Sequence, residues 1–224
     1  MSDGVRRALA DQTPLLRRAI ELDAACLARI RVDAETAAVF ARLPFGVLVA
    51  RTVSGGAVTA SDRTMLAREL LDWLEGDRVD EPAARDADWR GGLPPATGWR
   101  RVDSVPDTVV RELVRTGAAA LRDAADRAGV PGAEPRAEVA DALLDSVVLT
   151  VTADGAPDRA GADPATADRA EVTLRSLSAL TRMGFLARGS AAHVDVSGRW
   201  TRVVAAYGTV FAERPGLGLG LLGH

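Results

Sequence analysis

Residues 193–204 read HVDVSGRWTRVV. Polar and apolar side chains alternate over residues 193–196, Ser197-Gly198 fits a tight turn, and residues 199–204 fit a returning strand, which is the pattern of a β-hairpin. A second stretch, residues 47–53, reads VLVARTV and is followed by Ser54-Gly55-Gly56. Its β-branched residues predict a strand that returns through a turn. The sequence therefore predicts antiparallel hairpins.

Apolar residues at helical spacing surround these hairpins. They predict six helices: 14–31, 33–42, 61–75, one from the cap residue Ser104 to about Gly129, one that carries Val139, Leu143 and Leu144, and one that carries Leu177, Leu180 and Met183. Further strands are predicted at 147–152 and 171–174. Because helices outweigh strands in this interpretation, the predicted fold class is α+β, predominantly helical with short antiparallel hairpins.

The two halves of the chain share an order of predicted elements. Leu43 lies 101 residues before Leu144, and Trp99 lies 101 residues before Trp200. This common offset suggests an internal duplication of a helix-helix-hairpin-helix-strand unit. The predicted division is an N-terminal lobe (1–104), a C-terminal lobe (105–215) and a Gly/Leu tail (216–224), with one continuous domain as the alternative.

Composition excludes several classes of protein. The chain has 224 residues, a formal net charge of −3, one cysteine (Cys26) and two histidines (His193 and His224). An intrachain disulfide is impossible, and a structural zinc site lacks ligands, so no metal and no cofactor are predicted. All basic residues are arginine, which points to a G/C-rich bacterial genome such as that of an actinobacterium. No signal peptide or membrane-length apolar run is visible, so a cytoplasmic protein without membrane partners is expected.

The sequence offers only weak candidates for a catalytic site. His193, Asp195 and Ser197 alternate along one predicted strand and point the same way, but neighbours on a strand face lie about 6–7 Å apart, too far for a relay of hydrogen bonds. These residues fit the solvated face of a hairpin. Asp141 and Asp145 fit a solvated helix surface, and Cys26 fits a small buried apolar residue. No catalytic residue is assigned, and an enzyme remains the third hypothesis.

Two Trp-x-Arg pairs could bind a ligand. Trp99 with Arg101, and Trp200 with Arg202, would each share one strand face and offer an aromatic plate beside a guanidinium. An anion or an aromatic molecule would suit that arrangement. The alternative is that each Trp lies in the core and each Arg pairs with an acid.

The segment from Arg169 to Arg214 carries an excess of positive charge over an otherwise acidic chain. It contains Leu-x-x-Leu, then Gly184-Phe185-Leu186-x-Arg188, then the hairpin. This layout resembles the recognition helix and wing of winged-helix regulators of the MarR type. The resemblance implies DNA binding by residues 169–204. The phosphate contacts would come from four arginines: Arg175, Arg182, Arg199 and Arg202.

The first functional hypothesis is a non-catalytic protein that binds a protein partner or a small ligand. A homodimer is expected, because the leucines of the tail at 217, 219, 221 and 222 favour an apolar groove over water. A winged-helix DNA-binding regulator is the alternative, although nucleic acid is the less favoured partner.

Overall fold

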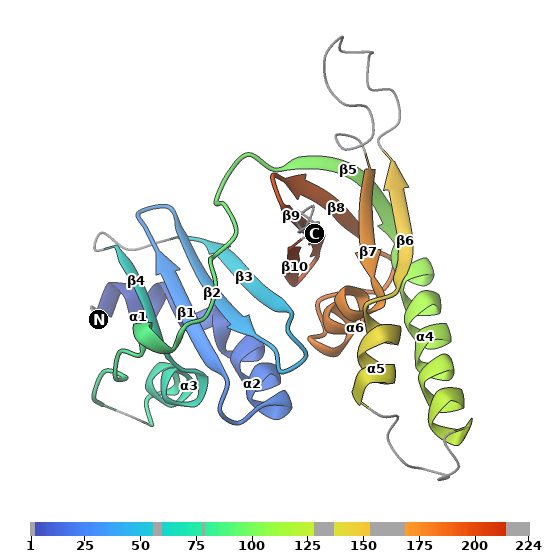
Figure 1. The fold of residues 1–224 in the computed structure, drawn as a ribbon. Coiled ribbons are helices and arrows are strands. Elements are labelled where there is room, and N and C mark those ends of the chain that lie inside the picture. Colours follow the sequence, from blue (N-terminus) through green and yellow to red (C-terminus); the bar gives the residue numbers. More distant parts are fainter. Residues whose placement is uncertain (1–2, 56–59, 78, 128–136, 153–168, 214–224) are drawn as a thin grey trace, which may run out of the picture.

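An antiparallel sheet of eight strands dominates the computed structural model of the chain, which describes residues 3–55, 60–77, 79–127, 137–152 and 169–213. The strand order is β4-β1-β2-β3-β10-β9-β8-β5 (Figure 1). The strands are β1 (Leu27–Val32), β2 (Thr36–Arg42), β3 (Leu48–Ser54), β4 (Ser61–Leu66), β5 (Arg100–Pro106), β8 (Ala191–Ser197), β9 (Trp200–Ala205) and β10 (Gly208–Glu213).

Two distant parts of the chain meet in this sheet. Strand β3 pairs with β10 through Ala50 with Thr209, and Leu48 with Phe211. We call this β3–β10 contact the seam. Since β1 to β4 lie on one side of the seam and β5, β8, β9 and β10 on the other, a single sheet crosses the predicted lobe boundary at residues 104 and 105. The division into two lobes therefore stays a prediction.

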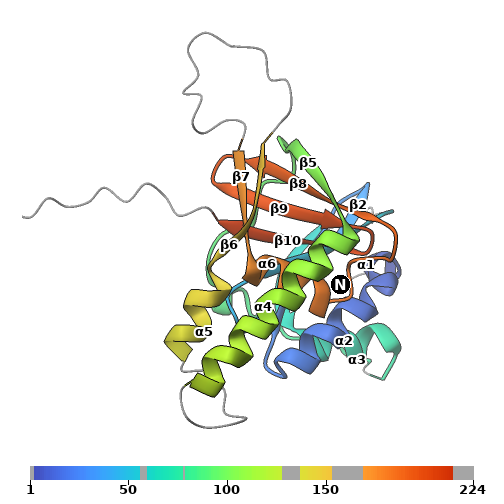
Figure 2. The ribbon, with the colours of Figure 1, turned by 90° about the vertical axis from the view of Figure 1, so that its right-hand side faces the viewer.

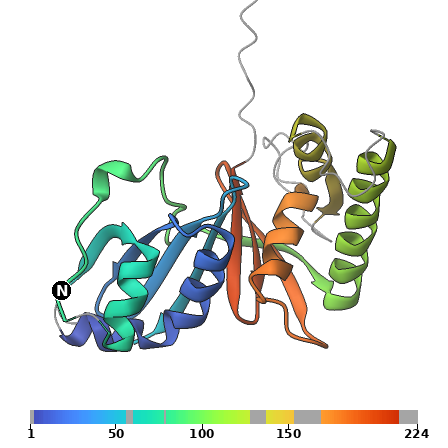
Figure 3. The same ribbon diagram turned by 90° about the horizontal axis from the view of Figure 1, so that it is seen from below.

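Helices and a second, smaller sheet complete the fold. The helices are α1 (Asp3–Leu9), α2 (Thr13–Leu22), α3 (Ala67–Glu75), α4 (Asp107–Arg127), α5 (Ala137–Leu144), α6 (Leu174–Arg182) and the short 3-10 turns η1 (Ala10–Gln12) and η2 (Asp86–Asp88). Strands β6 (Val147–Thr152) and β7 (Arg169–Thr173) form the two-stranded sheet. Helix α5 lies beside one end of α4 (Figure 2), and both are at the opposite end of the molecule from α1 to α3 (Figure 3).

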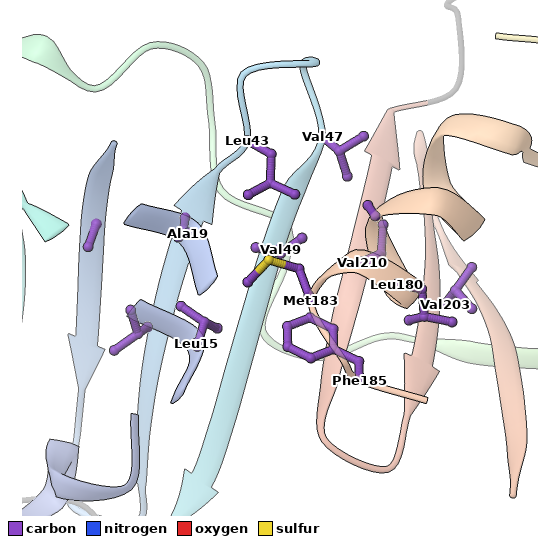
Figure 4. Close-up of a cluster of buried hydrophobic side chains, with 14 of the residues drawn as sticks. Leu15, Ala19, Leu43, Val47, Val49, Leu180, Met183, Phe185, Val203 and Val210 are labelled. Atoms are coloured by element: carbon purple, nitrogen blue, oxygen red, sulfur yellow. The ribbon is translucent and has the colours of Figure 1, made fainter. Parts of the chain in front are cut away.

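Helices α2 and α6 cover one face of the large sheet across the seam. Leu15 and Ala19 of α2 lie over Val49, while Leu180 of α6 lies over Val210 (Figure 4). Each helix has apolar residues at three- and four-residue spacing, so a single stripe is buried. Burial of these stripes against both parts of the sheet holds the seam together, since apolar area removed from water is the main stabilising term.

The opposite face is covered by the connection between α3 and β5, which crosses the sheet as an extended loop (Figure 1). Trp89 of this loop is 9% exposed and packs in an apolar cluster with Phe40, Trp200 and Phe211. A long surface connection is therefore held in place by an aromatic residue. The sheet is buried on both faces near its centre.

The expected predominance of helices is wrong. The part of the chain that the structure describes holds nearly equal shares of helix (37%) and strand (36%). Residues predicted as one long helix form α2 and then β1, because Asp23 ends the helix and accepts a hydrogen bond from the amide of Ala25 (2.9 Å). The predicted helix 33–42 is strand β2. Its residues Ala37 to Ala41 are all buried because both faces are covered, so no period-two pattern is visible.

The predicted duplication is also wrong. Val47 and Leu48 begin the seam strand of the large sheet, whereas Val148 and Leu149 lie in the two-stranded sheet. Trp99 precedes β5, an edge strand, whereas Trp200 begins the interior strand β9. The stretches that share the offset therefore do not occupy equivalent places in the fold. The tail 216–224 lies outside the described residues.

Candidate functional site

A cavity of about 1050 Å³ lies at one end of the seam, where β3 begins and β10 ends. We call it the seam cavity. Its apolar wall consists of Pro44, Phe45, Val47, Leu48, Trp200 and Phe211. Its charged groups are Arg42, Arg90, Arg175, Asp141, Asp145 and Glu213. A mostly apolar concavity with a few charged groups has the composition of a binding site.

Arg175 builds one wall of the seam cavity. Its guanidinium donates to Asp141 of α5 (2.9 Å), to Asp145 directly after that helix (2.7 Å) and to the carbonyl oxygen of Phe45 (2.7 Å). Hydrogen bonding to Asp145, followed by that to Asp141, raises the pKa of Arg175 above its usual value. Its charge is therefore neutralised within the protein, and its role is to connect α6, α5 and the β2–β3 turn.

Arg42 and Arg90 differ from Arg175, since neither has an ion-pair partner among the described residues. The guanidinium of Arg42 stacks 5.8 Å from the ring centre of Trp89. Gly91 has φ +82° and lies so close that a Cβ there would be 3.2 Å from the Arg42 guanidinium. The indole nitrogen of Trp89 and Nε of Arg42 are buried and have no hydrogen-bond partner. Two uncompensated positive charges thus lie beside the apolar wall.

The Trp and Arg residues predicted to bind a ligand are arranged in an unexpected way. Arg101, Asp195 and Arg202 form a row across β5, β8 and β9. Asp195 accepts from Arg101 (3.1 Å) and from Arg202 (2.9 Å). The Arg202 guanidinium lies 4.2 Å from the ring centre of Trp99. The structure thus brings Trp99, Arg101 and Arg202 together around one buried carboxylate, while Trp200 lines the seam cavity.

The four arginines of the DNA-binding hypothesis are dispersed. Arg175 is held by α5, Arg182 stacks on Phe45 at 5.9 Å, Arg199 pairs with Glu213 at 3.5 Å, and Arg202 pairs with Asp195. Helix α6 is buried against the sheet, and β8 and β9 are interior strands. Residues 169–204 therefore do not form a winged-helix unit with a projecting helix.

The residues weighed for catalysis have structural roles. Asp195 is 2% exposed and accepts hydrogen bonds from Arg101 and Arg202. Nδ1 of His193 lies 2.7 Å from Oγ of Ser104. Cys26 is buried as predicted, and burial raises the pKa of its thiol to about 12, which keeps it protonated and unreactive. Within the described part of the chain, no group of three or more His, Cys, Asp or Glu could hold a metal ion.

The seam cavity itself was not predicted from the sequence. Its residues come from six separate stretches, and Arg42 and Arg90 carry no motif. The one usable signal was the strongly turn-forming Leu43-Pro44-Phe45-Gly46, which places an aromatic ring at a strand end.

Among the described helices, none has the length and apolar composition that crossing a membrane requires.

The fold resembles that of bacterial sliding clamps. The DNA polymerase III subunit beta from Pseudomonas aeruginosa is similar over 93% of this chain and 62% of its own, with a TM-score of 0.54 and 15% identity. A ligand-bound DNA polymerase sliding clamp from the same organism gives a TM-score of 0.52, with 13% identity over 94% of this chain and 63% of its own. The Helicobacter pylori beta clamp in complex with carprofen gives 0.51, with 10% identity over 93% of this chain and 62% of its own. The chain thus spans less than two thirds of the length of these clamps.

Two family models match the sequence and together cover most of it. Residues 94–217 match the family described as "Domain of unknown function (DUF8185)", and residues 5–91 match "Domain of unknown function (DUF8010)". The first match covers more than half of the chain, which therefore belongs to the DUF8185 family. No curated protein matches the sequence.

Proposed function

We propose that this protein is a non-catalytic binding protein with a clamp-like fold, and that its seam cavity receives a short segment of a partner protein. The observation that carries this proposal is the pair of unpaired cations, Arg42 and Arg90, beside an apolar wall. A segment with apolar side chains and one carboxylate would complement both features.

The shape of the site favours a peptide over a small metabolite. Its volume of about 1050 Å³ is at the upper limit for small-molecule pockets. It also lies where two parts of the chain join, and Arg175 fixes the two parts relative to each other through Phe45. A preformed site loses little entropy on binding, which favours affinity for a short segment.

Peptide selection tests this function. A library of random peptides displayed on phage is selected on the immobilised full chain, and the enriched peptides are synthesised with a fluorophore. We expect them to combine apolar residues with an Asp or Glu. Anisotropy titration should show about tenfold weaker binding to Arg90→Glu, which is a difference of about 1.4 kcal/mol. Phe45→Asp should weaken binding as well.

Arg68→Glu is the matched control, since Arg68 is exposed on α3 and does not line the seam cavity. It should bind the selected peptides like the original protein. Equal affinity of Arg90→Glu, Phe45→Asp and Arg68→Glu for the peptides would contradict the proposal, as would a selection that enriches no peptide.

We further propose that the chain forms a homodimer. Strand β5 is an edge of the sheet and pairs only with β8 within the described residues. The other edge, β4, is covered: the amide of Thr64 donates to Asp86 (2.6 Å), and its carbonyl accepts from Arg85 (2.7 Å). An uncovered edge strand is a ready surface for self-association.

Light scattering checks the oligomeric state. The full chain should have the mass of a dimer, and the Leu-rich tail is expected to contribute to the contact. A chain that ends at Pro215 should therefore shift toward the monomer. A monomeric full chain would overturn the dimer, and an unchanged dimer after truncation would exclude a role for the tail.

A further inference from the structure

A second cavity, of about 570 Å³, lies at the opposite end of the seam, on the face of the sheet that carries the helices. We call it the helix-side cavity. Its lining comes from α2, from β3, from the residues that follow α6 and from the β9–β10 turn: Pro14, Leu15, Arg17, Arg18, Glu21, Arg51, Met183, Gly184, Phe185 and Tyr207. It shares no lining residue with the seam cavity, so it is an independent site.

Positive charge gathers in this cavity. Arg17, Arg18 and Arg51 line it together with one acid, Glu21. Arg17 pairs with Glu75 (2.6 Å) and Arg18 with Glu21 (3.2 Å), and both guanidinium groups remain more than half exposed. Such exposed pairs are weak and exchange with other anions at little cost.

Arg51 is the unpaired cation of the site. Its side chain is half-buried and has no hydrogen-bond or ion-pair partner among the described residues. It projects from β3 on the same face as Val49, two residues earlier, which packs in the core beneath the helices. A half-buried guanidinium without a bound anion favours anion binding, because partial desolvation strengthens its electrostatic attraction for an anion.

Tyr207 adds an aromatic group at the same place. It is the single tyrosine of the chain and is 54% exposed. Its backbone is held firmly: the amide of Tyr207 donates to the carbonyl of Phe185 (3.0 Å), and a Cβ on Gly208 would lie 2.6 Å from the Phe185 ring. The turn therefore holds the backbone from which the Tyr207 side chain lines the cavity.

The floor beneath these groups is apolar. Leu15 and Phe185 lie close to Met183 over the seam (Figure 4). The site thus combines three guanidinium groups, an exposed aromatic ring and an apolar floor. A ligand with both an aromatic base and a phosphate group matches all three features. Phosphate accepts several charge-assisted hydrogen bonds from arginine, and a base stacks on an aromatic side chain.

We propose that the helix-side cavity binds a nucleoside phosphate. Its phosphate contacts Arg51, with Arg17 and Arg18 alongside, and its base packs on Tyr207. The volume of about 570 Å³ is within the range for a ligand of this size. This site does not depend on the proposed occupant of the seam cavity, because the two cavities are at opposite ends of the seam.

A fluorescent nucleoside diphosphate, mant-ADP, is the probe for the experiment, titrated into the full chain and followed by anisotropy. Arg51→Gln and Tyr207→Ala should each weaken binding about tenfold. Tyr207→Phe keeps the ring, and Arg68→Gln removes an exposed arginine outside the cavity, so both should bind like the original protein. Circular dichroism melts of each variant confirm that it is folded.

Competition with unlabelled molecules identifies the chemistry. ADP should displace the probe, whereas inorganic phosphate and adenosine alone should compete more weakly. No binding by the original protein, or equal binding by Arg51→Gln, would overturn the site. Displacement by short duplex DNA but not by ADP would replace it with a nucleic-acid surface. Phosphate that competes as well as ADP would overturn the contact between the base and Tyr207.

Discussion

Replacing Asp195 by alanine is expected to lower the free energy of unfolding by about 2–4 kcal/mol. Asp195 is 2% exposed and accepts hydrogen bonds from Arg101 and Arg202. Without the carboxylate, both guanidinium groups lose their counter-charge. Arg101 remains 52% exposed, and water therefore recovers part of the loss for that residue. The buried end of Arg202, stacked on Trp99, recovers less.

Urea denaturation measures this difference, and the chain contains a matched control. Asp62 also lies between two arginines, at 2.7 Å from Arg29 and 3.8 Å from Arg31, but its side chain is 44% exposed. Asp62→Ala should cost less than about 1 kcal/mol, since exposed pairs contribute little. If Asp195→Ala and Asp62→Ala are equally stable, the carboxylate of Asp195 does not hold β5, β8 and β9 together.

Replacing Gly208 by alanine is expected to destabilise the protein by about 1–3 kcal/mol. The added Cβ would lie 2.6 Å from three atoms of the Phe185 ring. Phe185 is 2% exposed and packs with Met183 in the core over the seam, so a shift of its ring would disturb that packing. A melting temperature lower by roughly 3–10 °C is the expected readout in differential scanning calorimetry.

Two variants separate the clash from a general effect of glycine. Gly92→Ala adds the same methyl group at an exposed position, where the nearest atom is 3.9 Å away, and its melting temperature should stay the same or rise slightly. Phe185→Leu, introduced into Gly208→Ala, should recover part of the loss because the smaller side chain makes room. A Gly208→Ala variant as stable as Gly92→Ala would refute the close packing.

Local patterns in the sequence predicted several elements well. The hairpin 193–204 is β8 and β9, the strand at 47–53 is β3, and Gly76 ends α3 with φ +93°, as a helix stop of this kind requires. The helix predicted after the cap at Ser104 is α4, which begins at Asp107 because residues up to Pro106 belong to β5. In each case the signal is contained within about ten residues, such as alternation, a helical stripe or a glycine with positive φ.

The predictions failed where burial depends on distant parts of the chain. The first turns of residues 14–31 are helical, but the continued apolar spacing fits β1 as well, and Ala28, Ile30 and Val32 alternate into the core once β2 and β4 are beside them. Strand β10 was not predicted. Its apolar residues Val210 and Phe211 are adjacent and face opposite sides of a sheet that is covered on both.

The sequence alone determined that residues 43–46 and Ser197-Gly198 turn, where α3 ends, that Cys26 is buried, and that no disulfide can form within the chain. Tertiary structure alone decided that β3 meets β10, that Asp195 serves two arginines from neighbouring strands, and that both cavities open at the ends of that seam. The physical reason is the distance along the sequence over which each interaction acts. Backbone propensity and capping act over a few residues, whereas the seam brings together residues near 50 and residues near 210. The positive charges of Arg42, Arg51 and Arg90 can attract an anionic ligand only because folding places them without a counter-ion beside apolar walls.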